Sequence, residues 1–127
     1  MPINIEWKSQ KRIAYVVSSG IPDTIEMQNA ADTLLQVMRG TTAAVHLIWD
    51  VRSLDQFPSL IDCIRSPYVK HPRHGIVIVV GLSDKPLFRI LVNSLSRVIH
   101  LSIKTAESLE DGLALLHNLD SSLLEET

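Results

Sequence analysis

Residue types that mark whole classes of protein are scarce in this sequence. Its 127 residues include a single cysteine, so a disulfide framework is excluded and a reducing compartment, the cytoplasm, is expected. Aromatic residues make up 5%, too few for a platform on which nucleic-acid bases stack. Lys and Arg number 12 against 14 Asp and Glu, so the basic surface of a nucleic-acid binder is also missing. We therefore expect no nucleic-acid partner.

Motifs for catalysis, cofactor binding and membrane insertion are missing as well. The five glycines are scattered, and they form neither a phosphate-binding loop nor a Gly-x-Ser-x-Gly nucleophile elbow. No apolar run approaches the roughly 20 residues of a membrane span, and the first residues do not resemble a signal peptide. No nucleophile or acid–base pair with an orienting partner can be placed. A non-enzymatic protein without a cofactor is expected.

Aliphatic residues are abundant, and their spacing predicts the first elements. Residues 3–7 alternate between apolar and polar, and a polar turn separates them from the β-branched residues 12–18. So short a connection predicts an antiparallel hairpin. A helix follows, with Asp23 and Glu26 spaced as a capping box and Gly40 expected as its left-handed terminal residue.

The rest of the chain alternates strands with helices. Residues 43–49 and 76–80 are apolar runs typical of strands buried on both faces. Helices are predicted after Ser59, after Ser83 or Asp84, and after Ser108, with a loop over residues 66–74 and a shorter strand over residues 100–104. The order β-β-α-β-α-β-α-β-α predicts one α/β domain over residues 1–127: a mixed, mainly parallel sheet with an N-terminal antiparallel hairpin and four helices. Residues 121–127 are expected to fray.

Three stretches carry a resemblance to a known family: residues 45–50 (VHLIWD), 75–81 (GIVIVVG) and 105–116 (TAESLEDGLALL). With the initial hairpin, they resemble the STAS domain of bacterial anti-sigma factor antagonists and of the cytoplasmic part of sulfate transporters. The closer likeness is to small stand-alone bacterial antagonist-like proteins with largely unassigned roles. The resemblance implies a STAS-like fold, a regulatory function through protein contacts, and a partner that is kinase-like or an anti-sigma regulator.

Antagonists of that family carry an Asp-Ser/Thr-Ser-Gly element after the central strand, where a kinase phosphorylates the hydroxyl. The corresponding residues here are Asp50-Val51-Arg52-Ser53, so Asp50 matches while the hydroxyl pair and the glycine are missing. Ser53 is the substitute candidate for phosphorylation, which would add about two negative charges. In the alternative interpretation, Asp50 braces its own loop through its carboxylate. The candidate interaction and phospho-switch loop comprises Asp50, Arg52, Ser53, Asp55 and Phe57.

The helix predicted over residues 84–99 has more apolar residues than one buried stripe needs. The stripe is predicted as Phe88, Leu91, Val92, Leu95 and Val98, and Leu87 and Ile90 lie off it. Such a helix is expected to contact a second subunit, giving a homodimer, or an apolar ligand. The candidate ligand or interface patch comprises Leu87, Phe88, Ile90, Leu91 and Leu95.

The alternative function is a carrier or sensor for a small apolar or anionic molecule, bound between residues 50–57 and the helix over residues 84–99. A pocket lined by Phe57, Phe88, Leu91 and Leu95 would favour the carrier. A flat or convex surface there would favour the interaction domain.

No metal site is predicted. His71 and His74 lie in a proline-containing stretch without nearby Cys or acidic ligands, whereas a zinc site needs three or four convergent ligands. With Arg65 and Lys70 they form a small cationic patch that could meet an anionic ligand. Cys63 lies on the apolar side of a short helix and is expected to behave as a small hydrophobic residue.

Overall fold

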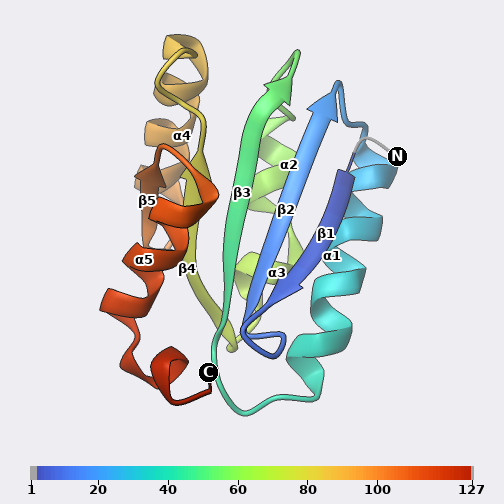
Figure 1. Cartoon of the computed structure of the whole chain (residues 1–127). Coiled ribbons are helices and arrows are strands. Elements are labelled where there is room, and N and C mark those ends of the chain that lie inside the picture. Colours follow the sequence, from blue (N-terminus) through green and yellow to red (C-terminus); the bar gives the residue numbers. More distant parts are fainter. Residues whose placement is uncertain (1–2, 127) are drawn as a thin grey trace.

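The first two strands form the predicted hairpin. The computed structural model describes residues 3–126, with side chains as far as Leu123 (Figure 1). In it β1 (Ile3–Lys8) pairs antiparallel with β2 (Ile13–Gly20). Side chains along β1 alternate between half-buried and exposed until the strand end, as the alternation of apolar and polar residues predicts.

The sheet holds five strands in the order β1-β2-β3-β4-β5. The strands β3 (Val45–Leu54), β4 (His74–Val80) and β5 (Ile103–Ala106) each run parallel to the strand before them, because a helical connection carries the chain back each time. The predicted α/β domain with a mixed, mainly parallel sheet is therefore confirmed.

The helix α1 (Thr24–Arg39) begins with the predicted capping box. The Glu26 N–H donates to Asp23 Oδ1 (2.8 Å), and the Asp23 N–H donates to Glu26 Oε1 (3.2 Å). The predicted left-handed end at Gly40 is wrong, because its φ is −96° and its N–H donates to the Val37 carbonyl within the last turn.

The other helices agree with the prediction except in two places. α2 (Leu60–Ile64) and α5 (Leu109–Leu119) are capped by the hydroxyls of Ser59 and Ser108, as predicted. α4 (Pro86–Val98) begins after Lys85 instead of Ser83 or Asp84, because Pro86 fixes the first helical turn. Residues 66–74, predicted as a loop, contain the single-turn α3 (Pro67–Lys70), which also begins with a proline.

Three strands, β2, β3 and β5, each end at least two residues later than predicted. β3 does not stop at residue 49: it continues to Leu54, because β2 stays paired with it as far as Gly20. The pairing is shifted by one extra residue of β3 between Asp50 and Ser53, a β-bulge. The strand predicted over residues 100–104 is instead β5, which covers Ile103–Ala106, because these are the residues that pair with β4. Residues 50–54 are therefore strand, not loop.

The two faces of the sheet are covered unequally (Figure 1). The larger core lies between the sheet and α1, α2, α3 and α4. The smaller core packs strand residues such as Ile48 and Ile78 against Leu116 of α5 and against Leu123. Leu123 belongs to the 3-10 helix η1 (Ser121–Glu126), so the chain is folded and partly buried where fraying was expected. Thr127 lies outside the described residues.

Candidate functional site

Asp50 is a buried carboxylate at the sheet face that α5 covers, and it is bonded to the buried Tyr15 and to the exposed Arg52. Its carboxylate accepts hydrogen bonds from Arg52 Nη2 (2.6 Å) and from the Tyr15 hydroxyl (2.6 Å). Burial alone would raise the pKa of Asp50, but the bonds from Arg52 and Tyr15 outweigh it and hold that pKa below its usual value. Burial raises the pKa of Tyr15, and the bond to Asp50 raises it further. Asp50 is thus an ionised group that braces the end of β3.

Gly81 provides the space that the Arg52 side chain needs. It follows β4 with a φ of +99°, a conformation that residues with a side chain rarely adopt. A Cβ at this position would also overlap Arg52 Cγ. The ion pair between Arg52 and Asp50 therefore depends on a glycine in the neighbouring strand connection, far away in the sequence.

The other residues of the predicted loop do not join the Asp50 cluster. Ser53 is exposed on β3 and Asp55 is exposed just beyond it. Phe57 is buried, with its ring 5.3 Å from that of Trp49 and 5.4 Å from that of Phe88. These three rings pack against one another, whereas Leu95, which was also expected to line a ligand pocket here, lines the cavity described below.

The helix α4 exposes a row of large apolar side chains, here called the outer face of α4. Leu87, Ile90 and Val98 are 65%, 62% and 58% exposed. At about 3.6 residues per turn these three positions share one side of the helix. Val98 was predicted in the buried stripe, but that place is taken by Ile99, which is buried together with Phe88, Val92 and Leu95. Leu91 is intermediate in exposure and lies between the two sides.

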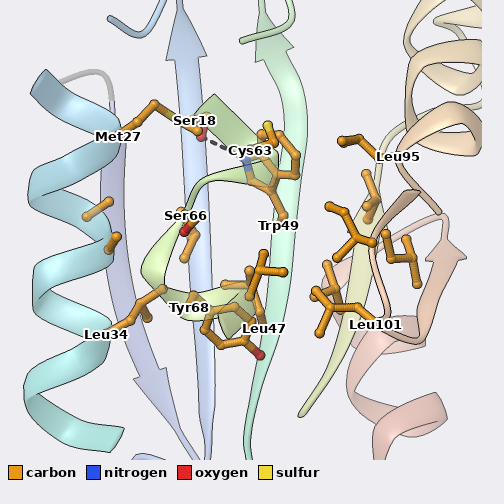
Figure 2. A pocket seen from close by; sticks show the side chains of 18 of the residues that line it. Ser18, Met27, Leu34, Leu47, Trp49, Cys63, Ser66, Tyr68, Leu95 and Leu101 are labelled. Carbon is orange, nitrogen blue, oxygen red and sulfur yellow. Dashed lines mark hydrogen bonds between the residues drawn. The ribbon is translucent and has the colours of Figure 1, made fainter. Parts of the chain in front are cut away.

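A cavity of about 130 Å³, here called the apolar cavity, lies between the sheet and the helices α1 to α4 (Figure 2). Figure 2 shows its wall formed by α1 on one side, the short helices α2 and α3 in the middle, and Leu95 and Leu101 on the other side. Its lining is almost entirely apolar. The lining residues are Ile3, Val16, Ser18, Met27, Ala30, Ala31, Leu34, Leu47, Trp49, Cys63, Ser66, Tyr68, Val69, Val77, Val79, Val92, Leu95, Ile99, Leu101 and Ile103.

A second hollow, here called the polar groove, adjoins the apolar cavity between α1 and the α2–α3 segment. Three residues line both: Met27, Ala31 and Ser66. The polar groove has a volume of about 470 Å³ and is otherwise lined by Thr24, Gln28, Asp32, Asp62, Arg65 and Pro67. Neither hollow was predicted from the sequence, because the walls come from elements that are far apart along the chain.

Cys63 and Tyr68 are buried in the wall of the apolar cavity. Burial raises the pKa of the Cys63 thiol to about 12, so the thiol stays protonated and behaves as the predicted hydrophobic residue. Burial also raises the pKa of Tyr68, whose hydroxyl donates to the Val45 carbonyl (2.7 Å). The polar atom of Tyr68 is thus engaged by the protein itself.

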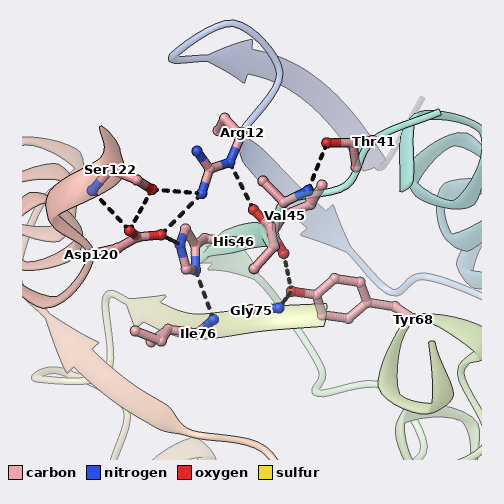
Figure 3. A network of polar contacts seen from close by, with 11 residues as sticks. Arg12, Thr41, Val45, His46, Tyr68, Gly75, Ile76, Asp120 and Ser122 are labelled. Carbon is pink, nitrogen blue, oxygen red and sulfur yellow. Dashed lines mark hydrogen bonds and ion pairs between the residues drawn. The ribbon is translucent and has the colours of Figure 1, made fainter. Parts of the chain in front are cut away.

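A second polar network ties the C-terminal segment to the sheet (Figure 3). His46 Nδ1 accepts the Ile76 N–H (2.9 Å), so its proton lies on Nε2, which donates to Asp120 Oδ2 (2.8 Å). Arg12 and the Ser122 hydroxyl also donate to the Asp120 carboxylate, at 3.0 and 2.6 Å. Burial alone would raise the pKa of Asp120, but the bonds from Ser122 and His46 lower it to about 2.

The cationic patch carries no metal-binding geometry in the part of the chain that the structure describes. His71 Nδ1 accepts the Arg73 N–H (3.0 Å). Among the side chains that the structure describes, no three of His, Cys, Asp or Glu are grouped so that they could hold a metal ion. Arg65 and Lys70 are exposed, and Arg65 lines the polar groove.

Comparison with protein-family models and with curated proteins gave no match to this chain. The STAS resemblance therefore stays a prediction. Among the helices of the described residues, none has both the length and the hydropathy to cross a membrane.

Proposed function

We propose that this chain is a non-enzymatic regulatory domain of the cytoplasm, similar in action to anti-sigma factor antagonists, which binds a partner protein through the outer face of α4. The observation that carries the proposal is the exposure of Leu87, Ile90 and Val98 on one side of a helix whose other side is fully packed. Large apolar side chains gathered on one helix side are typical of a surface that becomes buried in a complex.

The charges of α4 indicate what the partner surface carries. The helix contains no acidic residue, and the exposed Arg97, seven residues after Ile90, lies on the side of the outer face. A complementary surface therefore has an apolar ridge with acidic residues at its rim. In a symmetric dimer through this face, arginines of both copies would be brought towards one another, so we favour a different protein as the occupant. The expected homodimer would then use another surface.

Ser53 is the candidate for regulatory phosphorylation. Its exposure on β3 makes the hydroxyl accessible to a kinase, and Arg52 beside it is engaged by Asp50. A phosphate on Ser53 would compete with Asp50 for the Arg52 guanidinium. Peptide mass mapping of the protein from its host tests this role, and phosphate on another residue, or on none, contradicts it.

The partner-binding role is tested by photocrosslinking followed by affinity measurement. A benzoylphenylalanine at position 90 captures the partner in host cells, and mass spectrometry identifies it. Binding of the purified partner is then compared for the wild type, Ile90→Glu and Ile25→Glu. Ile25 is 67% exposed on α1, so Ile25→Glu adds the same charge at a distant exposed site.

We expect Ile90→Glu to weaken binding at least about tenfold, because a carboxylate would be buried at an apolar contact. Ile25→Glu should change the affinity by less than about twofold. Equal affinity of Ile90→Glu and the wild type would exclude the outer face of α4 as the binding surface.

A further inference from the structure

We propose that the apolar cavity is a binding site for a small neutral molecule with a ring-sized apolar body and one polar end, a hydroxyl or a carbonyl. This site is separate from the outer face of α4. It shares Leu95 with the ligand position predicted between residues 50–57 and the helix over residues 84–99, but Phe57 and Phe88 are not in its lining.

The size of the cavity sets the size of the ligand. Folded proteins contain few hollows larger than a water molecule in their cores, so a volume of about 130 Å³ between this sheet and its helices, partly open to solvent, is large enough to admit a ligand. An apolar cavity of ~150 Å³ in another protein stays dry and binds benzene. The apolar cavity therefore has room for a body of about six to eight non-hydrogen atoms.

Two hydroxyls in the wall can recognise the polar end. The Ser18 oxygen accepts the Trp49 Nε1–H (2.9 Å, Figure 2), which leaves the hydroxyl proton of Ser18 to donate to a ligand oxygen. Ser66 lines the cavity just before α3, and its side chain makes no capping hydrogen bond to that helix, so its hydroxyl can bond to a ligand. Ser18 is buried, and a hydrogen bond made there is shielded from water.

The charges near the cavity favour a neutral ligand. The apolar cavity has no charged side chain in its lining, so an ionised ligand group would lose its hydration without gaining a counter-charge. The adjoining polar groove presents Asp32 and Asp62 together with Arg65, a mixture that strongly selects neither an anion nor a cation.

The polar groove offers a route into the apolar cavity. Met27, Ala31 and Ser66 line both hollows, so the two meet between α1 and the α2–α3 segment. The helices α2 and α3 have only five and four residues and are held mainly by the buried side chains of Cys63 and Tyr68, so an opening of this segment is local. A ligand can therefore enter by a displacement of this segment, without unfolding of the sheet.

Three ring compounds that differ only in the polar end test the proposal on the full chain: benzyl alcohol, benzoate and benzylammonium. Binding is followed by methyl chemical shifts and by nuclear Overhauser contacts between ring protons and methyl groups. We expect saturable binding of benzyl alcohol with a Kd between ~10 μM and ~1 mM, and contacts to Leu34, Val77 and Leu95. Benzoate and benzylammonium should bind at least about tenfold more weakly.

Matched variants locate the site. Ala31→Leu fills the cavity wall and should weaken benzyl alcohol binding at least about tenfold. Ala114→Leu makes the same change on an exposed side of α5 and should leave the Kd unchanged. If Ala31→Leu does not fold, Ser18→Ala serves instead: it should reduce the preference for benzyl alcohol over toluene while ring contacts to Val77 persist.

Several results would overturn the proposal: no saturable shift of the cavity methyl groups, unchanged affinity in Ala31→Leu, or contacts only at Leu87 and Ile90. Tightest binding of benzoate or benzylammonium would overturn the neutral ligand class. Ile90→Glu should bind benzyl alcohol as the wild type does, so this proposal and the partner-binding role can fail independently.

Discussion

Asp120 shows how one carboxylate joins parts of the chain that are distant in sequence. Its bonds to Arg12 and His46 connect the residue after α5 with the starts of β2 and β3. The guanidinium of Arg12 is buried, so removing the Asp120 carboxylate would take an anionic partner from a charge that is shielded from water. The network thus holds the C-terminal segment at one end of the sheet.

Asp120→Asn is expected to lower the free energy of unfolding by about 2 to 4 kcal/mol, measured by urea denaturation at neutral pH. Asp32→Asn, an exposed change on α1, should stay within about 0.5 kcal/mol of the wild type. Similar losses in the two variants would show that the Asp120 network does not contribute to stability.

The pH dependence of stability provides a second readout of Asp120→Asn. Since the pKa of Asp120 falls from 3.8 to about 2 on folding, its contribution is fully present above pH 4 and is lost as the pH falls towards 2. The variant should therefore lose less stability than the wild type over this interval. The lowered pKa of Asp50 acts in the same direction, so part of the acid dependence should remain.

At the scale of elements, the ends of α1 and α4 show when local sequence determines a helix boundary. The capping box of Asp23 and Glu26 uses atoms three residues apart, so the sequence alone places the start of α1. The helix α4 has no side-chain cap, although Ser83 and Asp84 precede it, because Pro86 at its first position determines where the turn begins.

Asp23→Ala is expected to lower the free energy of unfolding by about 1 kcal/mol, because the Glu26 N–H loses its acceptor. Asp32→Ala, in an exposed position within the same helix, is the control and should change stability by less than about 0.5 kcal/mol. Equal losses of stability in Asp23→Ala and Asp32→Ala would mean that the capping box does not contribute to the free energy of unfolding. Urea denaturation followed by circular dichroism measures both.

At the scale of the whole molecule, the C-terminal part of the chain covers the face of the sheet that carries the smaller core. Helices α1 to α4 cover one face, whereas the core on the other is completed by α5 and Leu123. Leu123 is fully buried, and the Asp120 network lies just before it in the sequence. The C-terminal segment is therefore a part of the folded core.

Leu123→Ala should cost about 2 to 5 kcal/mol of the free energy of unfolding, because it opens a cavity in the smaller core. Leu119→Ala, the same change at a side chain that is 48% exposed, should cost less than about 1 kcal/mol. The two variants are compared by thermal and urea unfolding. Similar losses of stability in both would contradict the packing role of Leu123.

Local patterns by themselves determined the hairpin, the α1 cap and the two-sided apolar character of α4, because each rests on residues a few positions apart. Tertiary structure alone decided that Asp50 lies within a strand, since Asp50 pairs with Val17 of β2 and with Val80 of β4. The apolar cavity and the contact of His46 with Asp120 arise from packing between distant segments. The spacing of apolar residues specifies which side of a helix or strand is apolar. Only the tertiary packing of these elements, with the strands in register, specifies which atoms are in contact and where a cavity remains.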